Sequence, residues 1–137
     1  MSIATAIAAA ALGQVQSRLP KVIDARTHGV IDYCHAALFL GVAALCRKNN
    51  PRAAAVALAA GSFVLVESLL TDYPLGAAKV LSFRNHGRID SALAASSMFM
   101  PELFGFYGTP ESSIFKCTSL IEGTLVSLTD FNSELAR

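Results

Sequence analysis

One polar phrase occurs twice in this otherwise apolar chain, and its spacing limits the available folds more than any other feature. Residues 21–32 and 79–90 align without a gap at an offset of 58 residues, with seven identities in twelve positions. The same offset aligns residues 70–73 with residues 128–131 as Leu-Thr-Asp-aromatic. Ordinary composition gives roughly one identity in twelve by chance. The sequence therefore predicts two tandem copies of one unit, residues 20–77 and 78–137.

Each unit contains two long apolar runs, at residues 30–46 and 53–70 in the first copy and at 89–106 and 114–128 in the second. Roughly 20 apolar residues cross the hydrocarbon layer as a helix, slightly more than each run holds. Hydrophobic residues make up 53% of the chain and charged residues only 15%, against about 25% charge in soluble domains. We therefore predict one all-α membrane domain over residues 1–137, with four transmembrane helices formed by tandem duplication of a helical hairpin.

Residues 1–19 are expected to form a short N-terminal helix along the membrane interface. Because a two-helix unit returns the chain to the side it left, both polar phrases should lie on one face of the membrane. That face would carry more of the basic residues, which favours cytoplasmic termini in a bacterial inner membrane. A buried soluble four-helix bundle is the alternative. The net charge of +1 gives no electrostatic case for nucleic acid.

Each polar phrase places a histidine and an aspartate four residues apart: His28 with Asp32, and His86 with Asp90. Residues at this spacing share one face of a helix. Residues that suit a helix N-cap precede them at equivalent positions in the two copies. These are Asp24 and Ser82, or else Thr27 and Asn85. Both phrases therefore sit near the start of a helix.

The ionisable residues of the phrases are predicted to form two structural polar clusters, because a buried charge without a partner costs several kcal/mol. The first joins Arg26, His28 and Asp32 with Asp72 or Asp130, and the second joins Arg84, His86 and Asp90 in the same way. Two further carboxylates, Glu67 and Glu122, are predicted inside the membrane. By helical rise, Glu67 shares a shallow layer with Asp32 and Asp90, and Glu122 lies deeper.

No nucleotide-binding, zinc-binding or nucleophile signature is present, so neither an enzyme nor a metal site is predicted. The favoured function is a scaffold or accessory subunit that packs against other membrane proteins, or against a second copy, within the lipid bilayer. Abundant Ala, Gly and Ser suit such contacts. The alternative is a proton- or redox-active protein that binds haem b through His28 and His86, or a quinone. His35 has Leu93 as its counterpart, so no role is predicted for it.

The stretches RTHGVIDY, LLTDYPLGAAKVLSFRNHGRIDSALA and MPELFGF resemble the small bacterial membrane proteins of the SPW-repeat type, over about residues 20 to 130. The resemblance implies a four-helix integral membrane protein and brings no established activity or catalytic residues. Where that family has Ser-Pro-Trp, this chain has Met100, Pro101 and Glu102, and it contains no tryptophan.

Overall fold

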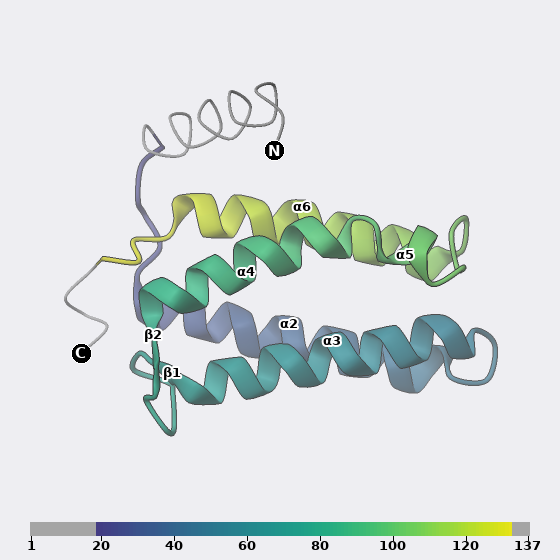
Figure 1. Cartoon of the computed structure of the whole chain (residues 1–137), viewed down its shortest axis with the longest axis horizontal. Coiled ribbons are helices and arrows are strands. Elements are labelled where there is room, and N and C mark those ends of the chain that lie inside the picture. The colour runs from purple at the N-terminus through teal and green to yellow at the C-terminus, as the bar shows by residue number, and fades with distance from the viewer. Residues whose placement is uncertain (1–18, 133–137) are drawn as a thin grey trace.

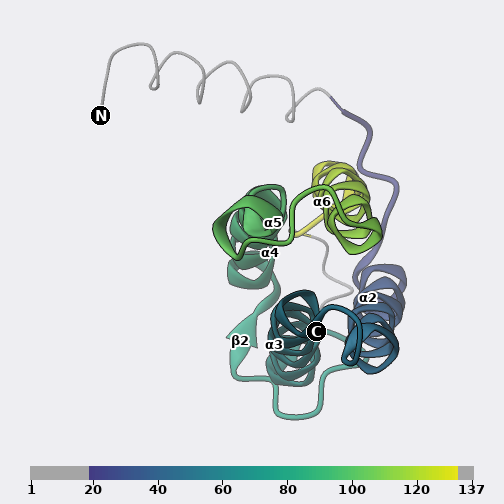
Figure 2. The ribbon, with the colours of Figure 1, turned by 90° about the vertical axis from the view of Figure 1, so that its right-hand side faces the viewer.

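The computed structural model describes residues 19–132, which form two helical hairpins joined by short strands (Figure 1). The first hairpin consists of α2 (Ala25–Cys46) and α3 (Pro51–Leu70), followed by β1 (Thr71–Asp72) and β2 (Leu81–Ser82). The second consists of α4 (Phe83–Ser97), the one-turn α5 (Met100–Leu103) and α6 (Pro110–Leu128). Seen along the helices, one hairpin lies on the other (Figure 2). The predicted N-terminal interfacial segment, residues 1–19, lies outside the described residues except for Leu19.

Side-chain caps begin the equivalent helices of the two hairpins. The Asp24 carboxylate accepts a hydrogen bond of 2.7 Å from the backbone N–H of Thr27 at the start of α2. The Ser82 hydroxyl accepts one of 3.3 Å from the N–H of Asn85 at the start of α4. Such bonds satisfy N–H groups that have no partner within the helix. Asp24 and Ser82 are therefore the caps, and Thr27 and Asn85 lie in the first turns.

The segments that enter and leave the hairpins pair crosswise. β1 runs parallel to β2, with Thr71 opposite Leu81. A single parallel bridge joins Ile23 to Thr129. The segment entering each hairpin therefore pairs with the segment leaving the other hairpin. We call this end of the molecule, on the left in Figure 1, the root end, and the opposite end the loop end.

Two apolar cores fill the ends of the molecule. At the loop end the rings of Phe39 and Phe115 lie 4.8 Å apart between centroids, surrounded mainly by buried alanines. At the root end Tyr73 and Phe83 pack with Ala25. The buried alanines at the loop end allow the helices to approach closely around these two rings, whereas the root-end core consists mainly of aromatic side chains.

The prediction of four transmembrane helices is wrong. Within residues 19–132, only α2 and α3 are long and apolar enough to cross a membrane, by length and composition. The apolar run at 89–106 is interrupted because α4 ends at Ser97. Pro101 has no N–H to donate to the Ser97 carbonyl, which an unbroken helix would require. The paired strands β1 and β2 also depart from the all-α prediction.

Candidate functional site

Four buried polar side chains meet at the root end, where α2 and α4 face each other. They are His28, Asp32, His86 and Asp90, and we call them the His–Asp cluster. Each is at most 3% exposed. Within each helix the histidine and aspartate are four residues apart, so both point from the same face.

The two histidines each contact both carboxylates of the cluster. His28 Nε2 lies 3.4 Å from Asp32 Oδ1 and 3.1 Å from Asp90 Oδ2. His86 Nε2 lies 3.2 Å from Asp32 Oδ2 and 2.9 Å from Asp90 Oδ2. One nitrogen or oxygen from each of the four side chains lies within 4.8 Å of all the others. The cluster is therefore a single site to which each hairpin contributes one histidine and one aspartate.

Two threonine hydroxyls orient the imidazole rings. His28 Nδ1 lies 2.9 Å from Thr129 Oγ1, and His86 Nδ1 lies 2.9 Å from Thr71 Oγ1. Each threonine donates its own hydroxyl proton to a backbone carbonyl one turn earlier, at 2.7 Å. Because that proton is already engaged, the oxygen accepts from the ring and Nδ1 carries a proton. In the neutral form of each imidazole, Nε2 therefore presents its lone pair to the carboxylates.

His86 Nε2 has an unusual environment. It is buried and makes no hydrogen bond of regular geometry with any residue between 19 and 132, although two carboxylate oxygens lie within 3.2 Å. The nitrogen therefore faces both carboxylates of the cluster.

Aromatic rings close the cluster at the root end. The His28 ring lies edge-on to the rings of Phe83 and Phe131, at centroid distances of 5.4 and 5.2 Å. The Tyr73 hydroxyl donates to Asp32 Oδ2 at 3.2 Å. Burial raises the pKa of Tyr73, so its phenol stays protonated and remains a donor. The rings shield the cluster from solvent on this side.

Two glycines allow these rings to approach. A Cβ at Gly29 would lie 2.7 Å from Cε2 of Tyr73, and a Cβ at Gly87 would lie 2.6 Å from Cε1 of Phe131. Both distances are far below van der Waals contact. The glycine of each phrase is therefore needed because an aromatic ring packs directly against the helix backbone.

Two further carboxylates and a third histidine lie in the interior. Glu67 of α3 is buried, with Oε1 3.5 Å from His86 Nδ1. Glu122 of α6 is also buried, and its Oε2 lies 3.0 Å from His35 Nδ1 of α2. This second pair borders a cavity of about 190 Å³ between α2 and α6.

The other residues predicted for the polar clusters lie outside this site. Arg26 is exposed, and the exposed Arg84 donates to Asn132 Oδ1 at 2.6 Å. Asp72 pairs with Lys79 at 3.8 Å, and Asp130 accepts from the backbone N–H of Asn132. The structure thus holds one cluster where two were expected, because the phrases of the two hairpins face each other rather than the loop aspartates.

Sequence reasoning missed three kinds of residue at the site. The threonines of the repeated Leu-Thr-Asp sequence contact the cluster, whereas the neighbouring aspartates were the residues predicted to do so. The aromatic residue that follows each Leu-Thr-Asp sequence, Tyr73 or Phe131, covers a glycine of a histidine-containing phrase. The repetition of the threonines and of these aromatic residues at the 58-residue offset was the available signal. His35 has no counterpart in the second copy, so nothing in the repeat pointed to its pairing with Glu122.

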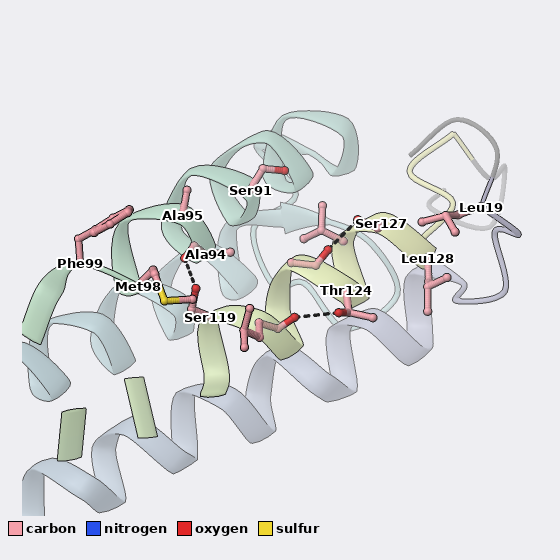
Figure 3. Close-up of a pocket in the computed structure, with 13 residues that line it drawn as sticks. Leu19, Ser91, Ala94, Ala95, Met98, Phe99, Ser119, Thr124, Ser127 and Leu128 are labelled. Carbon is pink, nitrogen blue, oxygen red and sulfur yellow. Dashed lines mark hydrogen bonds between the residues drawn. The ribbon is translucent and has the colours of Figure 1, made fainter. Parts of the chain in front are cut away.

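A separate groove of about 600 Å³ runs between α4 and α6, and none of the four cluster residues is part of its lining. Figure 3 shows the residues that line it. Small residues form much of its lining, among them Ala94, Ala95 and Gly123. The Ser119 hydroxyl donates to the Ala94 carbonyl at 2.6 Å and ties the two helices together there. The groove is mainly apolar, so it suits an apolar helix better than a polar ligand.

Comparison with protein-family models, with curated proteins and with solved structures finds no match for this chain. The motifs of this chain therefore resemble those of SPW-repeat proteins without a match that places it in that family.

Proposed function

We propose that this chain is a membrane-associated protein that binds one divalent transition-metal ion in the His–Asp cluster. The observation that carries the proposal is the convergence of two histidine Nε2 atoms and two carboxylates in a buried site. Imidazole and carboxylate are common ligands of Zn²⁺ and Fe²⁺. The spacing within each phrase brings one nitrogen and one oxygen ligand from each hairpin.

The distances between the ligand atoms suit such an ion. A tetrahedral ion with bonds of about 2.0–2.2 Å holds its ligand atoms roughly 3.3–3.6 Å apart. The four histidine–aspartate contacts run from 2.9 to 3.4 Å, with Asp32 using a different oxygen toward each histidine. One ligand atom from each of the four side chains lies within 4.8 Å of the others, so side-chain rotations that draw these atoms together would complete the coordination.

The surroundings of the cluster also resemble those of a metal site. Histidine ligands usually donate the other ring N–H to an oxygen, which fixes the orientation of the ring. Thr71 and Thr129 provide that oxygen for His86 and His28. Two neutral imidazoles and two carboxylates balance the charge of a divalent cation, which matters because unbalanced charge is costly in a buried site.

Haem fits this site less well. An axial arrangement requires the porphyrin to stand between the Nε2 atoms of His28 and His86. The carboxylates of Asp32 and Asp90 lie against those same nitrogens, and the two ring centroids are 5.3 Å apart. A single ion needs no such space.

Membrane association is supported by the distribution of polarity across α2 and α3. Their buried positions include His28, Asp32 and Glu67, whereas Leu45 is 84% and Leu58 is 55% exposed. Carboxylates inside and large apolar side chains outside are the pattern expected in lipid. We place the root end on the cytoplasmic side of a bacterial inner membrane, because it carries more basic residues among those that the structure describes. Five lie at the root end, Lys21, Arg26, Lys79, Arg84 and Arg88, against four toward the loop end, Arg47, Lys48, Arg52 and Lys116. Carbonate extraction and protease accessibility from each side test this placement.

Metal analysis of the full chain purified in mild detergent tests the binding proposal. We expect one ion per chain after incubation with Zn²⁺, and a tetrahedral absorption spectrum with Co²⁺. Asp90→Asn and His86→Ala should abolish both. The matched controls are Asp72→Asn and Asp130→Asn, which change nearby aspartates that lie outside the cluster. A wild-type protein that binds no ion, or controls that lose it equally, would refute the proposal.

The role of scaffold or accessory subunit is a second candidate, favoured by the groove between α4 and α6. Along α6, Ser119, Gly123 and Ser127 recur every four residues in its lining, a spacing that lets another helix approach closely. The proposed occupant is an apolar helix of a partner membrane subunit. A Cβ at Gly123 would meet no atom within 4 Å, so the backbone there can carry a side chain and Gly123→Leu is expected to fill the groove. If the Gly123→Leu variant migrates on native gels in a complex of the same size as the wild type does, that result would argue against this role.

A further inference from the structure

Three basic side chains line a pocket at the root end, beside the second hairpin. The pocket has a volume of about 400 Å³, and its charged groups come from Lys21, Arg84 and Arg88, which are all exposed. Among the described residues that line it, none is an aspartate or a glutamate. Arg84 and Arg88 are one turn apart on α4, so their side chains leave the same face of that helix. The pocket therefore concentrates positive charge that its own lining does not balance.

Neutral oxygen atoms hold the three side chains in place. Lys21 Nζ donates to a backbone carbonyl of α6 at 2.7 Å. Arg84 Nη2 donates to Asn132 Oδ1 at 2.6 Å, and Arg88 Nη1 donates to Asn85 Oδ1 at 3.1 Å. An ammonium group carries three N–H donors and a guanidinium group five. Each side chain therefore keeps donors beyond the one that these bonds use, and an anion in the pocket can accept from all three.

The equivalent place in the first hairpin lacks this concentration of charge. The 58-residue offset relates Lys21 to Lys79 and Arg88 to Val30. Lys79 pairs with the Asp72 carboxylate at 3.8 Å, and Val30 brings no charge. Because the first hairpin folds without them, these charges are not needed to build the root end. A structural role common to both hairpins therefore does not explain the basic pocket.

The basic pocket continues into the apolar groove between α4 and α6. Ser91, Val126 and Ser127 line both. From Ser91 and Ser127 the groove extends away from the root end as far as Phe99 (Figure 3). Figure 1 shows α4 and α6 running alongside α2 and α3, so the groove follows the direction of the helices that are long and apolar enough to cross a membrane. One continuous surface thus presents positive charge at the root end and apolar side chains beyond it.

We propose that this surface binds an anionic phospholipid, with the phosphate in the pocket of Lys21, Arg84 and Arg88 and an acyl chain in the groove between α4 and α6. Basic clusters on the cytoplasmic side of a membrane attract anionic headgroups, and guanidinium groups bind phosphate oxygens through paired N–H donors. The two volumes, about 400 and 600 Å³, are those of ordinary ligand sites. The inference rests on the proposed membrane placement and is independent of metal binding. It gives the groove a different occupant from the partner helix of the second candidate function.

Native mass spectrometry of the full chain, purified in mild detergent and freed of lipid, measures the binding. Three probes separate the contributions of charge and chain: phosphatidylglycerol, phosphatidylcholine with the same acyl chains, and glycerol phosphate. We expect phosphatidylglycerol to bind most tightly. Phosphatidylcholine carries a compensating positive charge in its headgroup, and glycerol phosphate has no chain to place in the groove.

A double variant tests the basic pocket. Arg84→Gln combined with Arg88→Gln removes two charges and should weaken phosphatidylglycerol binding by more than about tenfold, because each basic residue near an anionic lipid contributes roughly a factor of five. The matched control is Arg26→Gln, which changes the repeat-equivalent of Arg84 outside this pocket and should bind the lipid like the wild type. Circular dichroism establishes that each variant is folded.

A second variant tests the groove without changing any charge. Gly123→Leu places a side chain where the acyl chain would lie, so it should weaken phosphatidylglycerol binding and leave glycerol phosphate binding unchanged. Because the purified chain is studied without a partner subunit, such a loss reports the lipid and not a partner helix. Gly41→Leu is the matched control, since a Cβ at Gly41 also meets no atom within 4 Å and Gly41 does not line the groove.

The outcomes separate this inference from the proposed membrane placement. Equal binding of phosphatidylglycerol by the wild type and the double arginine variant would overturn the inference, as would equal binding of phosphatidylcholine. Glycerol phosphate that binds as tightly as the lipid, with no effect of Gly123→Leu, would mean that the pocket takes a phosphate without a chain and that the lipid assignment is wrong. A wild type that carbonate releases from membranes and that binds no lipid would refute the placement and the lipid site together. A wild type that stays in the membrane but binds lipid without regard to charge would refute the lipid site alone.

Discussion

The hairpin of α2 and α3 and the hairpin of α4 and α6 differ most at the loop end. Four residues, 47–50, connect α2 to α3, and Asn50 caps α3 directly. The second hairpin needs residues 98–109, including α5 and two glycines with positive φ, Gly105 and Gly108. The first hairpin is apolar enough to cross a membrane, whereas the second is shorter and more polar.

At the root end the same two hairpins are nearly equivalent. Each contributes one histidine, one aspartate and one threonine to the site, at positions 58 residues apart. The crosswise pairing of the entering and leaving segments is also equivalent. The repeated phrases therefore specify the root end, and the loop end is free to vary because it takes no part in the cluster.

The largest expected effect that tests the equivalence of the two hairpins at the root end comes from removing one histidine at a time. His28→Ala and His86→Ala should each weaken Zn²⁺ binding by more than about 100-fold, because each deletes a direct ligand. Calorimetry of the full chain in detergent measures the affinity, with His35→Ala as the control that removes a histidine outside the cluster. Loss in only one of the two variants would mean that the hairpins do not share one site.

The two threonines also test whether the hairpins are equivalent at the root end. They would contact the histidine ligands and not the ion itself. Thr71→Val and Thr129→Val keep the side-chain shape but remove the oxygen that accepts from Nδ1 of His86 or His28. Loss of such a partner typically lowers metal affinity by about 10–100-fold. The same calorimetry gives the result, and Thr124→Val, at an exposed position of α6, is the control. Unchanged affinity would show that the threonines do not orient the ligands.

Part of the fold was predictable because the repeat directly encodes it. The positions of the first hairpin's helices follow from the two apolar runs and, for α2, from the cap Asp24, whereas Asn50 was recognised as the cap of α3 only in the structure. Pro101 signalled the break after Ser97, but the apolar character of residues 89–106 led to the prediction of one continuous helix. Parallel pairing of two-residue strands involves contacts far apart in the sequence, and so short a segment has no period to detect.

The histidines and aspartates of the site were predictable from the sequence, but the arrangement of these side chains in one cluster was not. A one-turn spacing places His28 and Asp32 on one face, yet it does not say what that face meets. The sequence suggested separate pairing with Asp72 or Asp130, whereas in the structure the first turns of α2 and α4 point toward each other across the bundle (Figure 2) and bring the two phrases together. That choice depends on the tertiary arrangement of the hairpins, which no local pattern records.

Substitution of the glycines Gly29 and Gly87 should have a smaller effect, on stability, and this effect should differ between the two hairpins. Gly29→Ala forces a methyl group onto Tyr73, which is 0% exposed and cannot move aside. Gly87→Ala meets Phe131, which is partly exposed and can shift. We expect Gly29→Ala to lower the free energy of unfolding by about 1–3 kcal/mol and Gly87→Ala by less. Denaturant unfolding in detergent measures both.

Two other helical glycines provide the control for this pair. A Cβ at Gly41 or Gly123 would meet no atom within 4 Å. Alanine at either position should raise the stability by up to about 1 kcal/mol, because it favours the helix. Equal changes in stability for all four substitutions would show that contact with the aromatic rings does not determine the effect.

The smallest expected difference concerns the caps of α2 and α4, which are ionisable only in the first hairpin. The backbone hydrogen bond from Thr27 lowers the pKa of Asp24 below its ordinary value of 3.8. A lowered pKa means that the ionised cap stabilises the fold above that ordinary value, and that this contribution is lost as the pH falls through the lower, folded pKa. Ser82 has no titration in this range, so its contribution to α4 should not vary with pH. We therefore expect the melting temperature of the metal-free protein to differ between wild type and Asp24→Ala at about pH 6, and the difference to shrink towards about pH 3. The difference between wild type and Ser82→Ala should stay constant over the same range, and a parallel decline in both pairs would contradict the assignment of Asp24 as the titrating cap.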